Sequence, residues 1–271
     1  MARTVLFISD GTAITAETFG HSLLTQFQAT EFRQIRLPFV DTREKARDAV
    51  ELINRASEAD GVPALVFNTI VNKDVGALLN DSQGHVFDLF GTFLPPLEDI
   101  LGAVSSSSVG QAHGIRNTHD YEDRMEATNY ALTHDDGISS RMDEADVILI
   151  GVSRSGKTPT CLYMALHFGI KAANYPLTEE DLEKPRLPEF LRKHKDKLFG
   201  LTIEAERLAE IRETRRPNSR YASIKQCRYE VNAAEALLRS EGVPSLSSTN
   251  ASVEELGSRI LLELGLQRDL F

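Results

Sequence analysis

The stretch VILIGVSRSGKTPT, residues 147–160, constrains the fold of this chain more than any other part of it. An apolar run typical of a buried strand leads into a glycine-containing loop, and a segment of helical character follows. Gly151 to Thr158 matches the pattern GxxxxGK[ST], in which two glycines let the backbone curl around phosphate groups. Strand–loop–helix units of this kind build parallel α/β sheets. The stretch therefore predicts an α/β domain with a phosphate loop.

The loop supplies most of the residues that we expect to bind a ligand. Its backbone N–H groups and the positive end of the following helix favour an anion. We expect Lys157 to contact the β-phosphate of a nucleotide and to be catalytic, and the Thr158 hydroxyl to bind Mg²⁺. A strand-to-helix turn without a ligand is the alternative. The predicted nucleotide-binding residues here are Gly151, Val152, Ser153, Arg154, Ser155, Gly156, Lys157 and Thr158.

The sequence after the loop favours phosphoryl transfer over nucleotide hydrolysis. Neither the D-x-x-G nor the N-K-x-D motif of GTPases follows, and the expected strand 197–203 leads to Glu204 instead of a clear Walker-B aspartate. An arginine-rich segment comes next, as in small kinases whose arginines close over the phosphates. A solvated basic helix face is the alternative. The arginines that we expect to bind phosphate are Arg215, Arg216 and Arg220.

Two further motifs could carry chemistry. In SDGTA, residues 9–13, Asp10 could accept a proton and Thr12 could cap the following helix. In THDDG, His134, Asp135 and Asp136 could supply a general base or hold a metal ion. Each motif has a purely structural alternative, a helix-capping turn in the first case and a helix C-terminus in the second.

Strand-like and helix-like segments alternate twice along the chain. We expect strands at 4–9, 34–40 and 63–70, each followed by a helix, and then a linker or mobile segment over 91–117, which holds two prolines and four consecutive serines. The pattern restarts with a helix at 121–134 and strands at 146–151, 171–177, 197–203 and 243–249. The prediction is an N-terminal α/β domain with a mostly parallel sheet, residues 1–110, followed by a P-loop kinase-like α/β domain, residues 111–271.

Composition restricts partners and compartment. A net charge of −10 argues against broad binding of nucleic acid or anionic membranes. No apolar run is long enough for a membrane span or a secretory signal. Cys161 and Cys227 are isolated in the sequence, so we expect two buried reduced thiols and a cytoplasmic protein.

Several motifs together resemble the phosphoenolpyruvate synthase regulatory proteins, within the wider group of pyruvate, phosphate dikinase regulatory proteins. The resemblance runs from about residue 4 to the C-terminus, and the plain GKT ending at Gly156 to Thr158 looks like the synthase-directed branch. The motifs that carry it are FISDGTAITAETFGHSLLTQF, THDDG, GVSRSGKTPTCLYMALHFGIKAANYPL, KLFGLTI, RPNSRYAS, QCRYEV and STNASVEEL.

The resemblance implies a bifunctional enzyme. It would phosphorylate a threonine of phosphoenolpyruvate synthase with ADP as the donor, and would remove that phosphate with inorganic phosphate, releasing pyrophosphate. It also implies roles for Asp10, Thr12, His134, Asp135 and Asp136, and leaves open which acid is the base.

Two other functions fit the residues alone. One is a small-molecule P-loop kinase of the nucleotide or shikimate kinase type, although such kinases rarely carry an extra domain before the loop. The other is a nucleotide-gated module that regulates a partner without chemistry. A homodimer is expected only because dimers are common.

Overall fold

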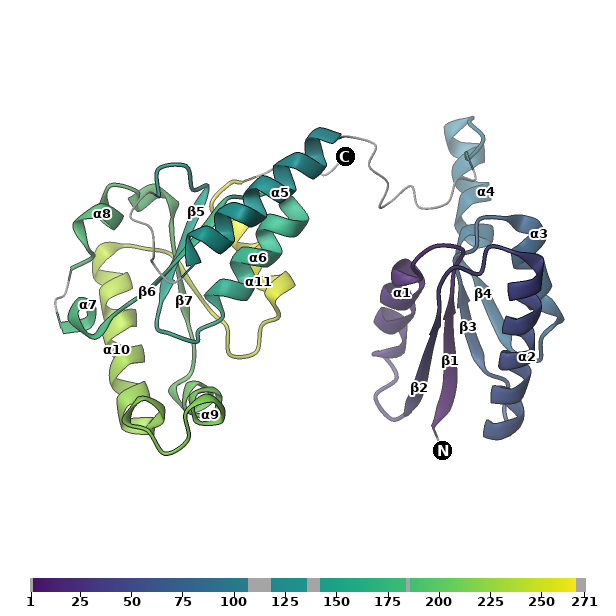
Figure 1. Ribbon diagram of the computed structural model, residues 1–271, viewed down its shortest axis with the longest axis horizontal. Coiled ribbons are helices and arrows are strands. Elements are labelled where there is room, and N and C mark those ends of the chain that lie inside the picture. Colours follow the sequence, from purple (N-terminus) through teal and green to yellow (C-terminus); the bar gives the residue numbers. More distant parts are fainter. Residues whose placement is uncertain (1, 107–117, 136–141, 184–185, 267–271) are drawn as a thin grey trace. The chain divides into compact units, whose positions relative to one another are not determined.

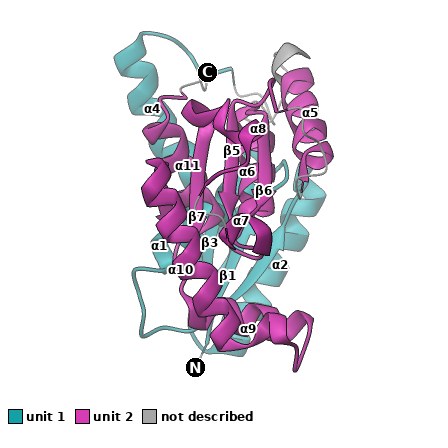
Figure 2. Cartoon of the chain, turned by 90° about the vertical axis from the view of Figure 1, so that its left-hand side faces the viewer, with its two compact units in different colours: residues 1–116 teal, residues 117–271 magenta. Residues whose placement is uncertain are grey.

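The computed structural model describes residues 2–106, 118–135, 142–183 and 186–266. The chain divides into two compact units, Met1–Arg116 and Asn117–Phe271 (Figure 2). The division falls within 107–117, outside the described residues, as does the expected boundary between 110 and 111. Each unit has its own four-stranded sheet, in which every strand pair is parallel, so the predicted α/β class is confirmed.

Unit 1 is a parallel sheet with the strand order β2-β1-β3-β4 (Figure 1). Successive side chains of the central strand point to opposite faces of the sheet. Leu6 and Ile8 pack in a core with α2, whereas Val5 and Phe7 pack in a core with α1. Its elements are β1 (Arg3–Ile8), α1 (Ile14–Leu24), β2 (Phe32–Leu37), α2 (Arg43–Asp60), β3 (Leu65–Asn68), α3 (Lys73–Gly76), the 3-10 helix η1 (Ala77–Asp81), β4 (His85–Asp88) and α4 (Leu89–Leu101).

Helix α4 corrects the expectation of a linker over 91–117. The Asp88 side chain accepts a hydrogen bond from the Gly91 N–H at 2.8 Å and so caps the first turn. Pro95 and Pro96 lie inside the helix, although each lacks the N–H that would continue the ladder. Residues 107–117 lie outside the described part of the chain. The stabilisation of the helix by its cap and by the apolar residues at helical spacing therefore exceeds the destabilisation by the two prolines.

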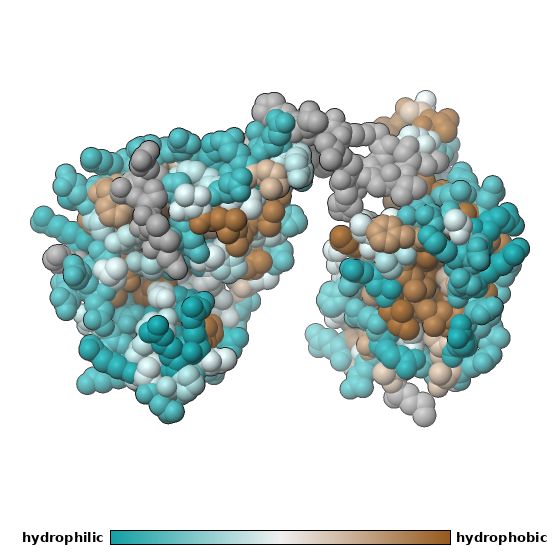
Figure 3. All heavy atoms as spheres, viewed as in Figure 1, coloured by the Kyte–Doolittle hydropathy of each residue, from teal (hydrophilic) through white to brown (hydrophobic). Residues whose placement is uncertain are grey.

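Many of the apolar side chains of α4 are exposed. Phe93, Leu97, Ile100 and Leu101 are each about half exposed or more, and α4 buries none of its residues within unit 1. Apolar atoms accordingly gather on this helix (Figure 3, brown).

The SDGT motif closes the carboxyl edge of the unit 1 sheet. Asp10 is only 6% exposed, and its Oδ2 accepts hydrogen bonds from the N–H groups of Val71 at 2.7 Å and Asn72 at 3.4 Å. The loop after β1 is thereby joined to the loop after β3. The expectation that Thr12 caps α1 is wrong. The cap position is Ala13, which has a φ of 61° and makes no side-chain hydrogen bond to the helix.

Unit 2 repeats the same strand order, β6-β5-β7-β8. Its strands are β5 (Val147–Gly151), β6 (Ala172–Pro176), β7 (Leu198–Thr202) and β8 (Ser245–Ser247). Helix α10 adds to the expected elements; Ser223 caps its start and Gly242 ends it. The helices are α5 (Thr118–Thr133), α6 (Lys157–Phe168), α7 (Glu179–Glu183), α8 (Glu189–Arg192), the 3-10 helices η3 (Lys195–Lys197) and η4 (Arg220–Ala222), α9 (Ala205–Arg215), α10 (Ile224–Glu241) and α11 (Val253–Glu263).

The two cores of unit 2 lie on opposite faces of its sheet. One contains Leu149 with residues of α5, α6 and α11, and the other contains Ile148 with residues of α9 and α10. Cys161 lies in the first core and Cys227 in the second, so both are buried free thiols, as predicted. Burial raises the pKa of both thiols. In the part of the chain that is described, no helix is long and apolar enough to cross a membrane.

The bonds of Asp10 predict a structural effect of its removal. Asp10→Ala leaves two backbone N–H groups near the sheet edge without their acceptor, so we expect unit 1 to lose about 1–3 kcal/mol of stability. Asp10→Asn retains an acceptor oxygen and should lose less. Calorimetric unfolding of the full chain measures both effects. Loss of activity by Asp10→Ala with an unchanged unfolding transition would instead indicate a chemical role.

Candidate active site

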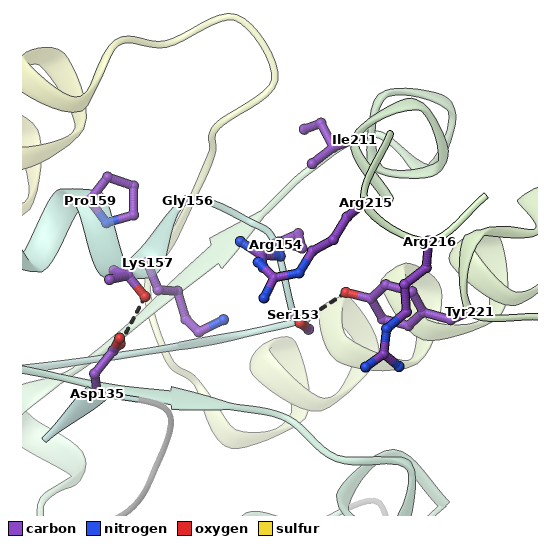
Figure 4. A pocket seen from close by; sticks show the side chains of 11 residues that line it. Asp135, Ser153, Arg154, Gly156, Lys157, Pro159, Ile211, Arg215, Arg216 and Tyr221 are labelled. Atoms are coloured by element: carbon purple, nitrogen blue, oxygen red, sulfur yellow. Dashed lines mark hydrogen bonds between the residues drawn. The ribbon is translucent and has the colours of Figure 1, made fainter. Parts of the chain in front are cut away.

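The phosphate loop joins β5 to α6, and its two glycines are needed for different reasons (Figure 4). A Cβ atom on Gly151 would collide with the carbonyl oxygen of Leu201 on β7. Gly156 has room around it, but its φ of 89° lies in the left-handed region that other residues avoid. The first glycine lets the loop pass β7 closely, and the second turns the chain into α6.

Arg154 is the loop residue with a strained backbone. Its φ is 76°, a conformation that costs a residue with a Cβ about 1–2 kcal/mol. Backbone strain of this kind concentrates at functional sites. Its side chain is exposed and lines the pocket, so the loop carries a cation at a position where glycine would be easier to accommodate.

Two polar side chains of the loop are buried. Lys157 is 4% exposed, and its Nζ donates a hydrogen bond to the carbonyl oxygen of Val152 at 2.9 Å. The hydroxyl of Ser155 is fully buried and has no hydrogen-bond partner among the described residues. Buried polar groups normally have partners, so this unpaired hydroxyl is consistent with a loop shaped around a polar ligand.

Thr158 is joined to an acid and an amide from two other elements. Its Oγ1 donates a hydrogen bond to Oδ1 of Asp135 at 2.8 Å, and Asp135 is the second residue after the end of α5. Asn174 on β6 donates from Nδ2 to the same Asp135 oxygen and also to Thr158 Oγ1 at 3.2 Å. These contacts hold one carboxylate against the start of α6.

Asn174 was not predicted as a site residue. It is 2% exposed, and it lies on β6 directly beside Leu149 of the loop strand. A polar residue inside an otherwise buried strand next to the phosphate-loop strand is the signal that could have identified it.

A pocket of about 750 Å³ opens beside the loop. This volume lies within the range of small-molecule sites. Arg215 and Arg216, which we expect to bind phosphate, line the pocket at the end of α9, and Tyr221 of η4 lines it without having been predicted (Figure 4). The lining residues are Asp135, Ser153, Arg154, Gly156, Lys157, Thr158, Pro159, Ile211, Arg215, Arg216 and Tyr221.

The lining of this pocket is cationic in a chain of negative net charge. Among the described residues, Lys157 and three arginines line it, together with one carboxylate, that of Asp135. A guanidinium group can bind two phosphate oxygens at once through two parallel hydrogen bonds, and an ammonium group binds them as a point charge. The arrangement therefore favours a ligand with several phosphate charges.

His134 and Arg220 do not line this pocket. His134 is buried, donates from Nδ1 to the Tyr130 carbonyl oxygen at 2.9 Å, and stacks on the Tyr130 ring at a centroid distance of 3.9 Å. The side chain of Arg220 is 81% exposed and lies 3.8 Å from Glu179. Asp136 is outside the described residues, and Asp10 belongs to unit 1. Of the acids and the histidine considered as bases, Asp135 is the described one that lines the pocket.

The oxygen atoms near Thr158 are suitable ligands for a hard cation such as Mg²⁺. Within the described residues, no group of three or more His, Cys, Asp or Glu side chains could hold a metal ion. Mg²⁺ bound together with a nucleotide needs only one or two protein oxygens, because phosphates and water supply the others. The Thr158 hydroxyl and the Asp135 carboxylate both line the pocket and provide oxygens of this kind.

The backbone of Gly156 gives a direct test of the loop. Gly156→Ala should strain the loop by about 1–2 kcal/mol and weaken ADP binding by about tenfold or more. Gly61→Ala is the matched control, because Gly61 has a φ of 68°, open space around it and a place in unit 1. Both variants should lose similar stability, and only the first should lose affinity. Titration calorimetry with ADP and thermal unfolding measure the two quantities, and equal affinities would contradict the assignment.

Comparison with known proteins places this site in a family. The profile of the kinase/pyrophosphorylase family matches residues 5–261. Similar full-length proteins carry the name "Putative phosphoenolpyruvate synthase regulatory protein". One from Marinobacter nauticus is 56% identical over 269 residues, 99% of both chains. One from Hahella chejuensis is 55% identical over 271 residues, 100% of both chains, and one from Pseudomonas aeruginosa is 55% identical over 99% of this chain and 98% of its own. The match spans both units, and the chain belongs to the kinase/pyrophosphorylase family.

Proposed function

We propose that this protein transfers the β-phosphoryl group of ADP to a threonine of phosphoenolpyruvate synthase, and removes it again with inorganic phosphate. The observation that carries the proposal is the pocket beside the phosphate loop, which four cationic side chains and one carboxylate line among the described residues. The family description, kinase/pyrophosphorylase, supports phosphoryl transfer in both senses. The names of the relatives support the synthase as the protein substrate.

In the kinase direction, the pocket would bind the diphosphate of ADP. Lys157 and Arg154 would contact its oxygens from the loop, and Arg215 would do so from α9. The threonine oxygen forms a bond to the β-phosphorus while the bond to the bridging oxygen breaks, and AMP leaves. Charge on the phosphoryl oxygens is stabilised by the surrounding cations, which is the main task of a protein in this chemistry.

Asp135 is the group that we assign to the proton. Its Oδ1 is held by Thr158 and Asn174, and no hydrogen bond within the described residues engages Oδ2. Oδ2 would accept the proton of the threonine hydroxyl as the new bond forms. A positioned base of this kind typically contributes about 10²–10⁴ in rate.

In the reverse sense, inorganic phosphate would occupy the place of the leaving AMP phosphate. One of its oxygens bonds to the phosphorus of the phosphothreonine, the bond to the threonine oxygen breaks, and pyrophosphate forms. The Asp135 carboxylate accepts the proton of the attacking phosphate hydroxyl and passes it to the threonine oxygen as that bond breaks. The same cations serve both reactions, because both place two phosphate groups in the pocket.

Thr158 and Asp135 would hold Mg²⁺ if it accompanies the nucleotide. When bound, the ion would neutralise charge on the phosphate oxygens. Their oxygens, 2.8 Å apart and open to the pocket, fit that role.

Radiolabelling tests the proposed reaction directly. We expect incubation with purified synthase and [β-³²P]ADP to place label on a synthase threonine and to release unlabelled AMP. Addition of inorganic phosphate should then move the label into pyrophosphate. Label only on small metabolites would indicate a small-molecule kinase, and nucleotide binding without transfer would indicate a regulatory module; either outcome contradicts the proposal.

Substitutions in the pocket separate charge from proton transfer. Lys157→Ala should lower both activities by at least about 100-fold and weaken ADP binding, because it removes a cation that contacts phosphate. Asp135→Asn should lower both activities by about 10²–10⁴ and leave ADP binding nearly unchanged. Lys193→Ala, which removes an exposed lysine of the same unit, is the control. Survival of phosphorolysis in Lys157→Ala would place that reaction at a different site.

A further inference from the structure

The phosphate loop is attached to the arginine-bearing segment through Ser153. The hydroxyl groups of Ser153 and Tyr221 lie 3.1 Å apart and share a hydrogen bond. The carbonyl oxygen of Ser153 accepts a hydrogen bond from Nη2 of Arg212 at 3.0 Å. One loop residue thus contacts α9 through its backbone and η4 through its side chain.

Arg212 connects these elements and is not among the residues that line the pocket. It is fully buried, and its Nη1 donates to the carbonyl oxygen of Tyr221 at 3.1 Å. Its guanidinium carbon also lies 4.1 Å from the centre of the Tyr221 ring, a cation–π distance. The guanidinium therefore contacts the loop at one point and both the backbone and the ring of Tyr221.

The charge of Arg212 has one close counter-ion. Oε2 of Glu230 on α10 accepts from Arg212 Nη2 at 2.7 Å, and Glu230 is 8% exposed. Gln226 donates to the other Glu230 oxygen at 2.9 Å and so fixes the carboxylate. A buried ion pair is weak evidence for stability, because desolvation offsets much of the attraction. The Arg212–Glu230 pair is also hydrogen-bonded to Ser153 of the phosphate loop, so a role in holding that loop explains the pair better.

We propose that Arg212 is a positioning residue, which fixes residues 213–222 to the phosphate loop and so holds Arg215 and Arg216 at the pocket. This inference rests on the function proposed above, since it assigns those two arginines to phosphate. Arg212 itself does not line the pocket, so it acts through the residues that it holds. Because the kinase and phosphorolysis reactions use the same two arginines, loosening this attachment should weaken ADP and inorganic phosphate alike.

A purely structural arginine would behave differently. It would change the stability of unit 2 without a selective effect on residues 213–222 or on ligand affinity. The lysine substitution separates these roles, because lysine keeps the positive charge beside Glu230 but lacks the planar fork that reaches three acceptors at once.

The experiment compares Arg212→Lys and Glu230→Gln in the full chain, with Arg207→Lys as the control. Arg207 lies on the same helix but is exposed, and it pairs only with Glu210 among the described residues. Hydrogen exchange is measured on peptides covering 213–222, and calorimetry measures the affinities for ADP and for inorganic phosphate. None of these measurements requires the synthase, so they stay informative even if no label reaches a synthase threonine.

We expect Arg212→Lys and Glu230→Gln to exchange at least about tenfold faster over 213–222 and to bind both ligands about tenfold more weakly, whereas the control is unchanged. If Arg212→Lys does not fold, Tyr221→Phe, which removes only the hydroxyl bonded to Ser153, should show the same changes to a smaller extent. Unchanged exchange and affinities in the folded variants, or a loss of stability without them, would overturn the proposal.

Discussion

The passage of the phosphate loop across β7 is the constraint on which the site of this protein depends. Gly151 lies so close to the Leu201 carbonyl that no side chain fits there. The chain therefore passes close to β7 at Gly151 and then continues through the loop into α6. Two attachments start from it: Ser153 contacts Arg212 and Tyr221 on one side, and Thr158 contacts Asp135 and Asn174 on the other. The pocket between them gathers its cations and its carboxylate from elements far apart in the sequence.

The two units share one strand order, but the carboxyl edges of their sheets differ. In each sheet the first strand lies between the second and the third, so the crevice at its carboxyl edge is a natural ligand site. In unit 1, Asp10 bridges that crevice by accepting hydrogen bonds from two backbone N–H groups of the loop after β3. In unit 2, the corresponding edge carries a loop whose Lys157 and Ser155 are buried and turned inward. The position in the sheet is the same. The Asp10 carboxylate is bound by backbone N–H groups, whereas the loop of unit 2 borders a pocket lined by cations, which is suited to an anion.

The alternation of apolar and amphipathic segments was sufficient to predict most strands, because buried parallel strands and their covering helices differ in period. Helix α4 was missed because Pro95 and Pro96 were interpreted as breakers, although Asp88 caps the helix and apolar residues recur at helical spacing. Asn174 and Tyr221 lie in stretches that carry the family resemblance, but both were missed because nothing in the local pattern around either residue indicates a chemical role. Each becomes part of the site only through a hydrogen bond to a loop residue that lies 16 or 68 positions away.

The sequence by itself determined the phosphate loop, the α/β class and the family, since all three depend on short patterns in which neighbouring residues act together. Only the tertiary structure showed that Asp135, in the described part of unit 2, lies beside the loop. His134 and Asp135 are adjacent in the chain, yet the first packs on Tyr130 and the second binds Thr158, because the chain turns at the end of α5 and sends their side chains in different directions. The same holds for the arginines. Arg212 and Arg215 lie less than one turn apart on α9, yet Arg212 is buried beside Glu230 and contacts Ser153 of the loop, whereas Arg215 lines the pocket.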